Sequence, residues 1–409
     1  MQSQKIVWPA VLLTALFGMS VLLLWGVSVI MGITAIPMLF TKNAEAVTSM
    51  IVAASTGFLG LVLFAAAILA LLKIMGREVA EKNIHLPFAP WHIPLALLIA
   101  VTSIGIGGLV ASQQNYLSVI FLPILTLSGV LAPLWIIMNL GTHQMALGPR
   151  WRAWGIFGLG MTLGPLIMMF LEVAVGIFIL IGVVIYFASQ PELANKIVQF
   201  SAQLQSTPGS EQILNLLAPY LLKPTTIALV LTYTSLAIPM IEELFKPIGV
   251  WLFARQLKTP MAGFAMGILS GTAYAIVENL GTTAQAGAGW SAIVIARTGA
   301  GLLHIANTGL MGWAIVSLVN EKKVARFLLT YIATVTLHGL WNSASVGLVI
   351  YSVAQELGKS TSYPWVDVMN VAALAVLTVT SLIVLIASNH KVKASGMAEP
   401  DPIQKAGQI

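Results

Sequence analysis

Long apolar stretches recur along this 409-residue chain and limit the folds open to it. A helix needs about 20 apolar residues to cross the hydrocarbon core of a bilayer. Only helices and closed barrels satisfy their backbone hydrogen bonds in lipid, and the short alternating segments of barrel strands are absent. We therefore expect an all-α polytopic membrane protein with ten transmembrane helices, at residues 8–36, 49–73, 90–112, 116–140, 154–187, 225–253, 261–282, 290–318, 327–353 and 367–388.

The composition supports this class and excludes several functions. Hydrophobic residues make up 58% of the chain and charged residues 8%, whereas a soluble domain carries about 25% charged residues. The chain has no cysteine, which excludes disulfides, thiolate metal sites and a cysteine nucleophile. The basic residues lie at the ends of the predicted spans and not in one patch, so we expect no nucleic-acid partner.

The distribution of lysine and arginine predicts how the chain is oriented. Fourteen of these residues fall in connections on the side of the N-terminus and four on the other side. The positive-inside rule then places both termini in the cytoplasm. The first apolar run is too long for the core of a cleavable signal peptide, so we expect it to be retained as a span.

Ionisable residues interrupt the later apolar segments. An ionised side chain at mid-membrane costs about 2.5–3.5 kcal/mol on insertion scales, so such groups usually mark functional sites. The interruptions are Glu242, Glu243 and Lys246 in IEELFKP, Glu278 in AYAIVENLG, and two histidines, His304 and His338. We interpret this cluster as the functional site.

The spacing within IEELFKP separates the two glutamates. Adjacent helical residues point about 100° apart, so Glu242 and Glu243 are expected to have different roles. Lys246 is within helical reach of either carboxylate. Pro239 and Pro247 bracket the motif, and each removes a backbone donor, which opens the helix locally. The alternative is a buried ion pair that only holds helices together.

Glu278 has two possible roles. Tyr274 lies four residues before it, so both residues share a helical face. Glu278 could pair with Arg297, which begins the next span on the same side. Counted at 1.5 Å per residue, Glu278 falls near the outer end of its span, whereas His304 and His338 fall near mid-membrane. A direct role in the site is therefore left open.

The two histidines suit metal ligation, proton transfer or oxyanion stabilisation. His338 shares a helical face with Asn342 in the string HGLWN, and His304 is followed four residues later by Thr308. Glu172 stands alone in the fifth span. It is either protonated and hydrogen-bonded to a neighbouring helix or a further acid of the site.

Four motifs resemble those of a known family. EELFK, AYAIVEN, RTGAGLLH and HGLWN, within about residues 227–348, resemble the PrsW family of intramembrane proteases. This family belongs to a superfamily of glutamate-dependent membrane peptidases with the CAAX prenyl endopeptidases and bacteriocin-processing enzymes. Tyr274 stands where the family usually has phenylalanine. The CAAX branch typically has histidine in place of Glu278, so that branch matches less well.

The resemblance implies hydrolysis of a peptide bond within or beside the membrane. It implies a general base among Glu242 and Glu243, with Lys246 as their counter-charge. It also implies that a divalent metal, with zinc as the candidate, would be held by Glu243, Glu278, His304 and His338. Without a metal, His338 and Asn342 would supply the oxyanion contacts. The supporting residues would be Arg297, Tyr274 and Asn279.

The resemblance also suggests a substrate and a location. The expected partners are the lipid bilayer and a membrane protein substrate, for example a single-span protein like an anti-sigma factor, in a prokaryotic plasma membrane. The predicted organisation is an N-terminal membrane domain (1–188), an extracytoplasmic amphipathic connection (189–224), a catalytic core (225–355), a final span with its preceding loop (356–388) and a disordered cytoplasmic tail (389–409).

Three alternatives remain. Buried acids and proline-broken helices would also suit a proton-coupled secondary transporter. The other two are a CAAX-type endopeptidase of the same superfamily and a scaffold in which the charges only pair. The acids gather in the last five spans, with Glu172 alone among the first five, which favours the enzyme over the transporter.

Overall fold

A computed structural model describes most of the chain and shows it to be helical. The described residues contain no β-strand, and ten of their helical segments are long and apolar enough to cross a membrane. The expected all-α polytopic architecture is therefore confirmed, while the cytoplasmic placement of the termini stays a prediction. The described residues are 7–40, 45–84, 86, 89–113, 115–189, 195, 199–203, 205, 212–213, 216–217, 220, 222–356 and 365–397.

The chain folds into two compact units, each assembled from separate stretches. The first contains Met1–Pro165, Glu243–Thr334 and Thr378–Ile409, and the second contains Leu166–Glu242 and Val335–Leu377. The predicted division of the chain by role, from 1–188 to 389–409, stays a prediction. Most of the connection at 189–224 lies outside the described residues.

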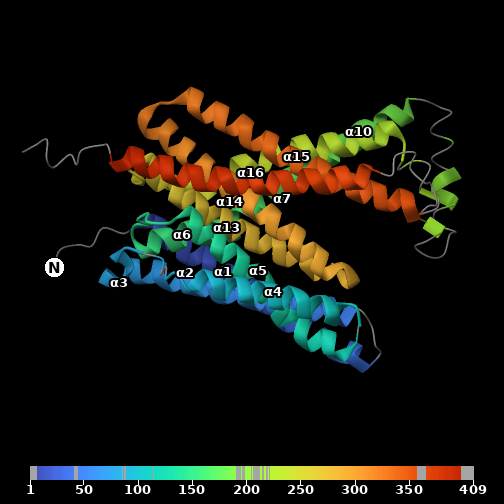
Figure 1. Cartoon of the computed structure of the whole chain (residues 1–409), viewed down its shortest axis with the longest axis horizontal. Helices are drawn as coiled ribbons and strands as arrows, with labels where there is room; N and C mark the ends of the chain where they lie inside the picture. Colours follow the sequence, from blue (N-terminus) through green and yellow to red (C-terminus); the bar gives the residue numbers. More distant parts are fainter. Residues whose placement is uncertain are drawn as a thin grey trace, which may run out of the picture. The chain divides into compact units, whose positions relative to one another are not determined.

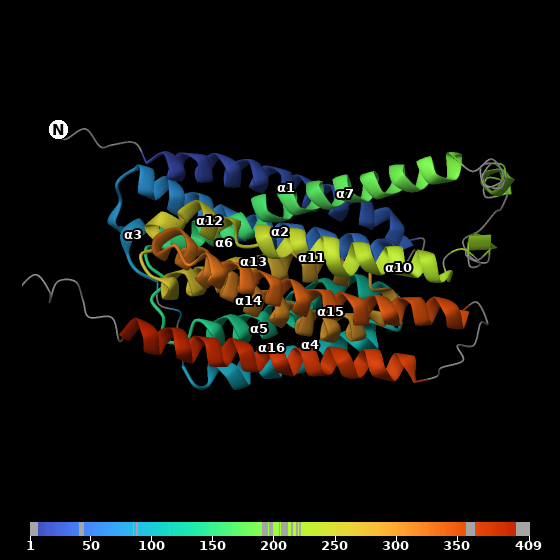
Figure 2. The same ribbon diagram turned by 90° about the horizontal axis from the view of Figure 1, so that it is seen from above.

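The N-terminal part of the first unit is a set of antiparallel helices. α1 packs along α2, and α4 packs along α5, as Figure 2 shows from above. The short α3 follows α2, and α6 packs against α2 and α13. These helices are α1 (Trp8–Phe40), α2 (Glu45–Ile74), α3 (Glu78–Glu81), α4 (His92–Ala111), α5 (Tyr116–Gly141) and α6 (Arg150–Met161).

Two helices from the later sequence form the core of the first unit. α13 (Pro260–Ala284) and α14 (Trp290–Glu321) pack side by side (Figure 1). In the most apolar 18-residue stretch of each of these two helices, 78% of the residues are buried, whereas in the other candidate spans the share is 44% or less. They are preceded by α12 (Ile248–Phe253) and the 3₁₀ turn η2 (Ala254–Gln256), and joined through η3 (Gly287–Gly289).

Small residues explain why α13 and α14 approach so closely. Gly267 and Gly271 are four residues apart on α13. A Cβ added at Gly267 would lie 2.3 Å from the carbonyl oxygen of Thr308 on α14, and one at Gly271 would lie 2.8 Å from the Thr308 Cβ. Glycines at this spacing let membrane helices pack backbone to backbone. The spacing of Gly267 and Gly271 can be read from the sequence, but the prediction of the site relied on the charged residues and did not take these glycines into account.

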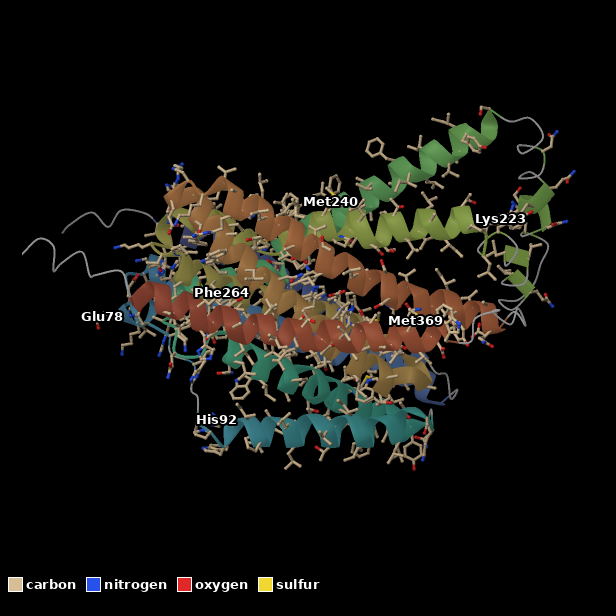
Figure 3. All side chains as sticks on the ribbon, turned by 45° about the horizontal axis from the view of Figure 1, so that its top comes forward. Glu78, His92, Lys223, Met240, Phe264 and Met369 are labelled. Atoms are coloured by element: carbon tan, nitrogen blue, oxygen red, sulfur yellow. The ribbon has the colours of Figure 1, made fainter. Side chains whose placement is uncertain are left out.

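The second unit is built around a broken helix. α10 (Pro224–Thr232) leads into a π-helical turn, η1 (Tyr233–Ala237), and then into α11 (Ile238–Phe245). Figure 3 labels Lys223, at the start of this run, and Met240 on α11. Pro239 lacks the N–H that would bond the Ser235 carbonyl, so the irregular turn lies where the sequence predicted local opening. Most of α7 (Leu163–Ala188) and parts of α15 (Val324–Glu356) and α16 (Val366–Met397) complete the unit.

The fifth predicted span, 154–187, is two helices and not one. α6 ends at Met161 and α7 begins at Leu163, with Thr162 at φ −121° and ψ −81° between them. Pro165 removes the N–H that would have bonded the Met161 carbonyl, which accounts for the break.

The end of the last helix also differs from the prediction. A disordered tail was expected from residue 389, but α16 continues to Met397. Asn389 donates a hydrogen bond to the carbonyl of Gly141 at 2.9 Å, and Lys393 donates to Oε1 of Gln144 at 3.2 Å. These bonds fix the added turns within the first unit. Residues 398–409 of the predicted tail lie outside the described residues.

Candidate active site

The EELFK motif of the sequence ends in a buried ion pair. α11 ends at Phe245 and α12 begins at Ile248, so Lys246 and Pro247 occupy a helix break. The Lys246 Nζ lies 2.7 Å from Oε1 of Glu243, and both side chains are 0% exposed. Of the two glutamates that Lys246 was expected to reach, Glu243 is the one paired with it inside the first unit.

The helix break is held by donors from other elements. The indole Nε1 of Trp251 donates to the carbonyl of Leu244 at 2.9 Å, and the Ser270 hydroxyl donates to the carbonyl of Lys246 at 2.7 Å. The carbonyls at the end of a helix and in the break that follows it have no partner within the helix, so other donors must satisfy them. Neither Ser270 nor Trp251 was predicted from the sequence. The sequence predicted only a helix break at Pro247, and such a break requires donors from elsewhere without indicating which residues supply them.

His304 has a polar partner at each ring nitrogen. Its Nδ1 lies 2.9 Å from Nζ of Lys246, and its Nε2 lies 2.9 Å from Oε2 of Glu278. An ammonium group can only donate, so Nδ1 accepts and, in the neutral ring, Nε2 carries the proton on the side that faces Glu278. The Tyr274 ring meets the His304 ring edge-on at 5.3 Å and lies 5.2 Å from the Lys246 Nζ. These contacts fix both the tautomer and the ring orientation.

Glu278 joins this network from the other side. Its Oε2 lies 2.6 Å from Nη2 of Arg297, the pairing considered as one of its two roles. Asn279 holds Arg297 in place, since its amide donates to the Arg297 carbonyl and its Oδ1 accepts from Arg297 Nε, both at 2.9 Å. The Glu278 side chain is 29% exposed and that of Arg297 17%. The network therefore runs from a fully buried end at Glu243 to a partly exposed end at Glu278.

The charges of the network balance. With His304 neutral, the carboxylates of Glu243 and Glu278 offset the cations of Lys246 and Arg297. Buried charges persist only when they are paired and hydrogen-bonded. Charged and polar residues from three separate sequence motifs thus form one connected network in the first unit.

Asn307 is a further buried polar residue of this region, and it was not predicted from the sequence. It follows His304 by three residues, and its amide donates to the carbonyl of Thr334 at 3.0 Å. This bond ties α14 to the first part of α15, four residues before His338 in the same helix. A buried amide in an apolar span was the signal available for it.

The second unit contains the remaining site residues. The Oε2 of Glu242 lies 3.9 Å from Nε2 of His338, with side chains 8% and 2% exposed. The Asn342 amide donates to the carbonyl of Thr234 in the π-helical turn at 2.8 Å. A Cβ at Gly339 would lie 2.2 Å from the Ser235 carbonyl oxygen, so α15 approaches this turn closely.

The other acid of the second unit, Glu172, lies on α7. Its backbone carbonyl accepts a hydrogen bond from the Tyr233 hydroxyl at 2.9 Å. This bond connects α7 to the π-helical turn. The two roles considered for the Glu172 carboxylate stay predictions.

The residue types present fit a metal centre. Glu242, His304 and His338 are buried, and each offers one atom that a metal ion could bind. Two histidines and one glutamate are a common donor set for catalytic zinc. Two carboxylates of the predicted metal set are engaged in ion pairs, Glu243 with Lys246 and Glu278 with Arg297.

Comparison with known proteins identifies the family. Residues 148–378, more than half of the chain, match the family described as PrsW family intramembrane metalloprotease. The match begins before α6, extends into α16 and includes every residue of the site described above. No curated protein and no solved structure matches the chain significantly. The chain therefore belongs to the PrsW family of intramembrane metalloproteases, and it is a multi-pass membrane protein that hydrolyses peptide bonds of membrane proteins.

Proposed function

We propose that this protein is an endopeptidase that cleaves a single-span membrane protein within or next to its span, using water activated at Glu242. The observation that carries the proposal is the different surroundings of the two adjacent glutamates. Glu243 is fully buried and paired with Lys246 at 2.7 Å. Glu242 lies 3.9 Å from His338, a group that can itself exchange a proton. Proton transfer is therefore assigned to Glu242 and a structural role to Glu243.

In this proposal Glu242 carries the proton of the reaction. One oxygen of its carboxylate takes a proton from the attacking water and returns it to the nitrogen of the departing peptide. A positioned carboxylate can perform both transfers in turn. His338 orients the water from the neighbouring face of α15.

Asn342 is proposed to contact the scissile carbonyl. One N–H of its amide is used by the Thr234 carbonyl, and the amide carries a second N–H. Without a metal, that second donor and His338, one helical turn away, would stabilise the negative charge that develops on the carbonyl oxygen. The bond to Thr234 fixes the orientation of the amide before the substrate arrives.

The proposed metal ligands are His338, Glu242 through the carboxylate oxygen that does not transfer the proton, and His304 through Nδ1, where the metal would replace the hydrogen bond from Lys246. This choice rests on the family, on the burial of the three residues and on their donor atoms. A zinc ion bound there would polarise the water and lower its pKa toward neutrality. The chain's contribution to such a site includes the Glu278–His304 bond, because a carboxylate behind a histidine fixes the ring and raises its basicity.

The substrate and the membrane are proposed from the resemblance of the motifs. An anti-sigma-factor-like protein with one span is the candidate substrate, and a prokaryotic plasma membrane the candidate location. The transporter and scaffold alternatives lose their support, because the matched family consists of peptide hydrolases.

The test is a search for new peptide ends. The full-length chain is added to proteoliposomes that contain a membrane proteome, and newly formed N-termini are labelled and sequenced. The proposal predicts new N-termini within or beside predicted single spans with the wild type and none with His338→Ala. Cleavage confined to soluble proteins, or an unchanged set of products with His338→Ala, contradicts it. His390→Ala, at an exposed histidine of α16, is the matched control.

A further inference from the structure

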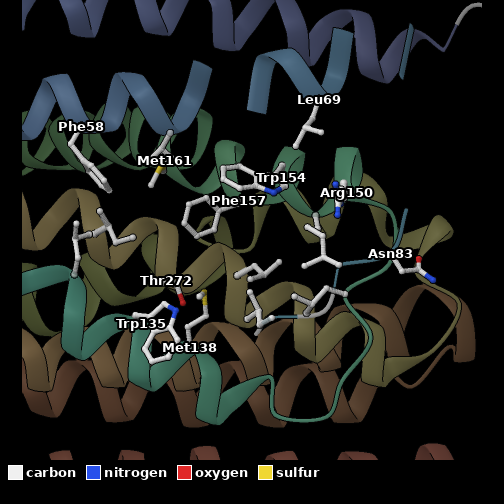
Figure 4. A pocket seen from close by; sticks show the side chains of 18 residues that line it. Phe58, Leu69, Asn83, Trp135, Met138, Arg150, Trp154, Phe157, Met161 and Thr272 are labelled. Carbon is white, nitrogen blue, oxygen red and sulfur yellow. The ribbon is translucent and has the colours of Figure 1, made fainter. Parts of the chain in front are cut away.

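A large cavity lies within the first unit, apart from the charged network. It has a volume of about 580 Å³ and is formed by α2, α5, α6, α13 and the segment that follows α3 (Figure 4). Cavities of about 300–1,000 Å³ are typical of small-molecule sites. This volume suits a slender apolar molecule and is too small for a transmembrane helix with its side chains.

The walls of the cavity are apolar except at a few places. Of the 18 side chains that line it, three are polar: Asn83, Arg150 and Thr272. Figure 4 shows Arg150 and Asn83 toward one end and Phe58 toward the other. The cavity is thus amphipathic along its length, with its one charged group, a cation, near one end.

More positive charge surrounds the Arg150 end. The backbone N–H of Arg150 donates to the carbonyl of Lys82 at 3.0 Å, and Ile84 donates to the carbonyl of Gly148 at 3.0 Å, so these two segments lie together. These segments and the residues next to them carry five basic residues, Lys73, Arg77, Lys82, Arg150 and Arg152, and two acidic residues, Glu78 and Glu81. Glu81 is paired with Lys73. The remaining excess of cations favours an anionic ligand.

We propose that this cavity binds one anionic phospholipid. An acyl chain would lie along the aromatic and aliphatic walls, and the phosphate would be bound by Arg150 beside Asn83. Basic pockets between transmembrane helices are known to take anionic lipid headgroups. A zwitterionic lipid would leave the excess positive charge uncompensated. The proposal does not depend on the proposed function.

The position of the cavity gives the bound lipid a structural consequence. Leu269, Thr272 and Ile276 of α13 line it, and the same helix carries Tyr274 and Glu278 of the charged network. A lipid in the cavity fills space behind this helix. We therefore expect binding to raise the unfolding temperature of the purified protein.

The test compares lipids of equal acyl chains and different charge. The full-length protein is purified in detergent, titrated with phosphatidylglycerol or phosphatidylcholine, and analysed by native mass spectrometry. We expect one phosphatidylglycerol to be retained in preference to phosphatidylcholine. Arg150→Gln should weaken phosphatidylglycerol binding about fivefold, the effect of one cation near an anionic lipid. Arg255→Gln, at an exposed arginine outside the cavity, should leave it unchanged.

A second measurement locates the lipid without a variant. Phosphatidylglycerol with a photoreactive acyl chain is cross-linked to the wild type, and the labelled peptides are sequenced. Labelling of α6 around Trp154 and of α5 around Met138 is expected, since both residues line the cavity. Equal binding of the two lipids, equal loss in Arg150→Gln and Arg255→Gln, or labelling confined to other helices would overturn the proposal.

Discussion

Nε2 of His304 lies 2.9 Å from Oε2 of Glu278, and this contact connects two motifs that are 26 residues apart in the sequence. Glu278 and His304 are therefore neighbours, although counting residues along their helices placed them at different depths in the membrane. The close packing of α13 on α14 at Gly267 and Gly271 explains it, because a tight helix pair brings together residues on facing sides.

The Arg297–Glu278 pair should control how well His304 is positioned. Arg297→Gln removes the cation beside Glu278 while keeping a hydrogen-bonding side chain. We expect the rate constant of cleavage to fall about 10- to 100-fold, the usual effect of losing a partner behind a metal-binding histidine, with little change in KM. Steady-state kinetics with Arg255→Gln as the exposed control checks this. A change in KM alone would show that Arg297 acts on substrate binding instead.

The Lys246–Glu243 pair should be needed for stability. Lys246→Met leaves the Glu243 carboxylate buried without its cation, and breaking a buried pair costs about 3–5 kcal/mol. The double variant Lys246→Met/Glu243→Gln removes both charges and should recover part of the loss. Unfolding of the purified protein measures both effects.

Lys258→Met, at an exposed lysine, is the control for that comparison. It should unfold like the wild type. If Lys246→Met unfolded no more easily than Lys258→Met, the pair would contribute nothing to stability and Glu243 would need another role.

The glycine contact between α13 and α14 gives a prediction about packing. Gly267→Leu forces a side chain against the backbone of Thr308, whereas Gly281→Leu adds one where nothing lies within 4 Å. Overpacking costs about 1–3 kcal/mol, so Gly267→Leu should lower the free energy of unfolding by that amount and also reduce cleavage. Gly281→Leu should do neither. Equal effects of the two substitutions would contradict the close approach.

Metal content tests the proposed ligands. We expect one zinc ion per purified wild-type chain, loss of that metal in His338→Ala and in Glu242→Gln, and its retention in His390→Ala. Elemental analysis of the purified proteins gives the answer. Fully active protein that contains no metal would contradict the proposed ligand set.

Much of the fold could be predicted from the sequence because the bilayer imposes a simple rule on apolar length. All ten spans are found, with ends that differ from the prediction by a few residues. The rule failed where one residue changes the backbone, at Pro165, and where tertiary hydrogen bonds extend a helix, at Asn389 and Lys393. Hydropathy carries no information about either effect.

The members of the charged network were predictable from the sequence, but which of them pair with one another was less so. Charges in apolar spans identified Lys246, Glu278 and His304, since each is costly to bury without a purpose. Spacing could not decide which glutamate Lys246 binds, because helical reach allows both. Ser270 and Trp251 gave no signal of their own, since a serine or a tryptophan in an apolar span is common and its partner is a backbone carbonyl.

The central claim is that Glu242, and not its neighbour Glu243, activates the water. The direct measurement is the rate of cleavage of a reconstituted single-span substrate by Glu242→Gln and by Glu243→Gln, each corrected for the amount of folded protein. We predict that Glu242→Gln lowers the cleavage rate at least about 100-fold, the lower end of the range for loss of a general base, while folded Glu243→Gln retains measurable cleavage. Wild-type cleavage by Glu242→Gln, with loss confined to Glu243→Gln, would contradict the account.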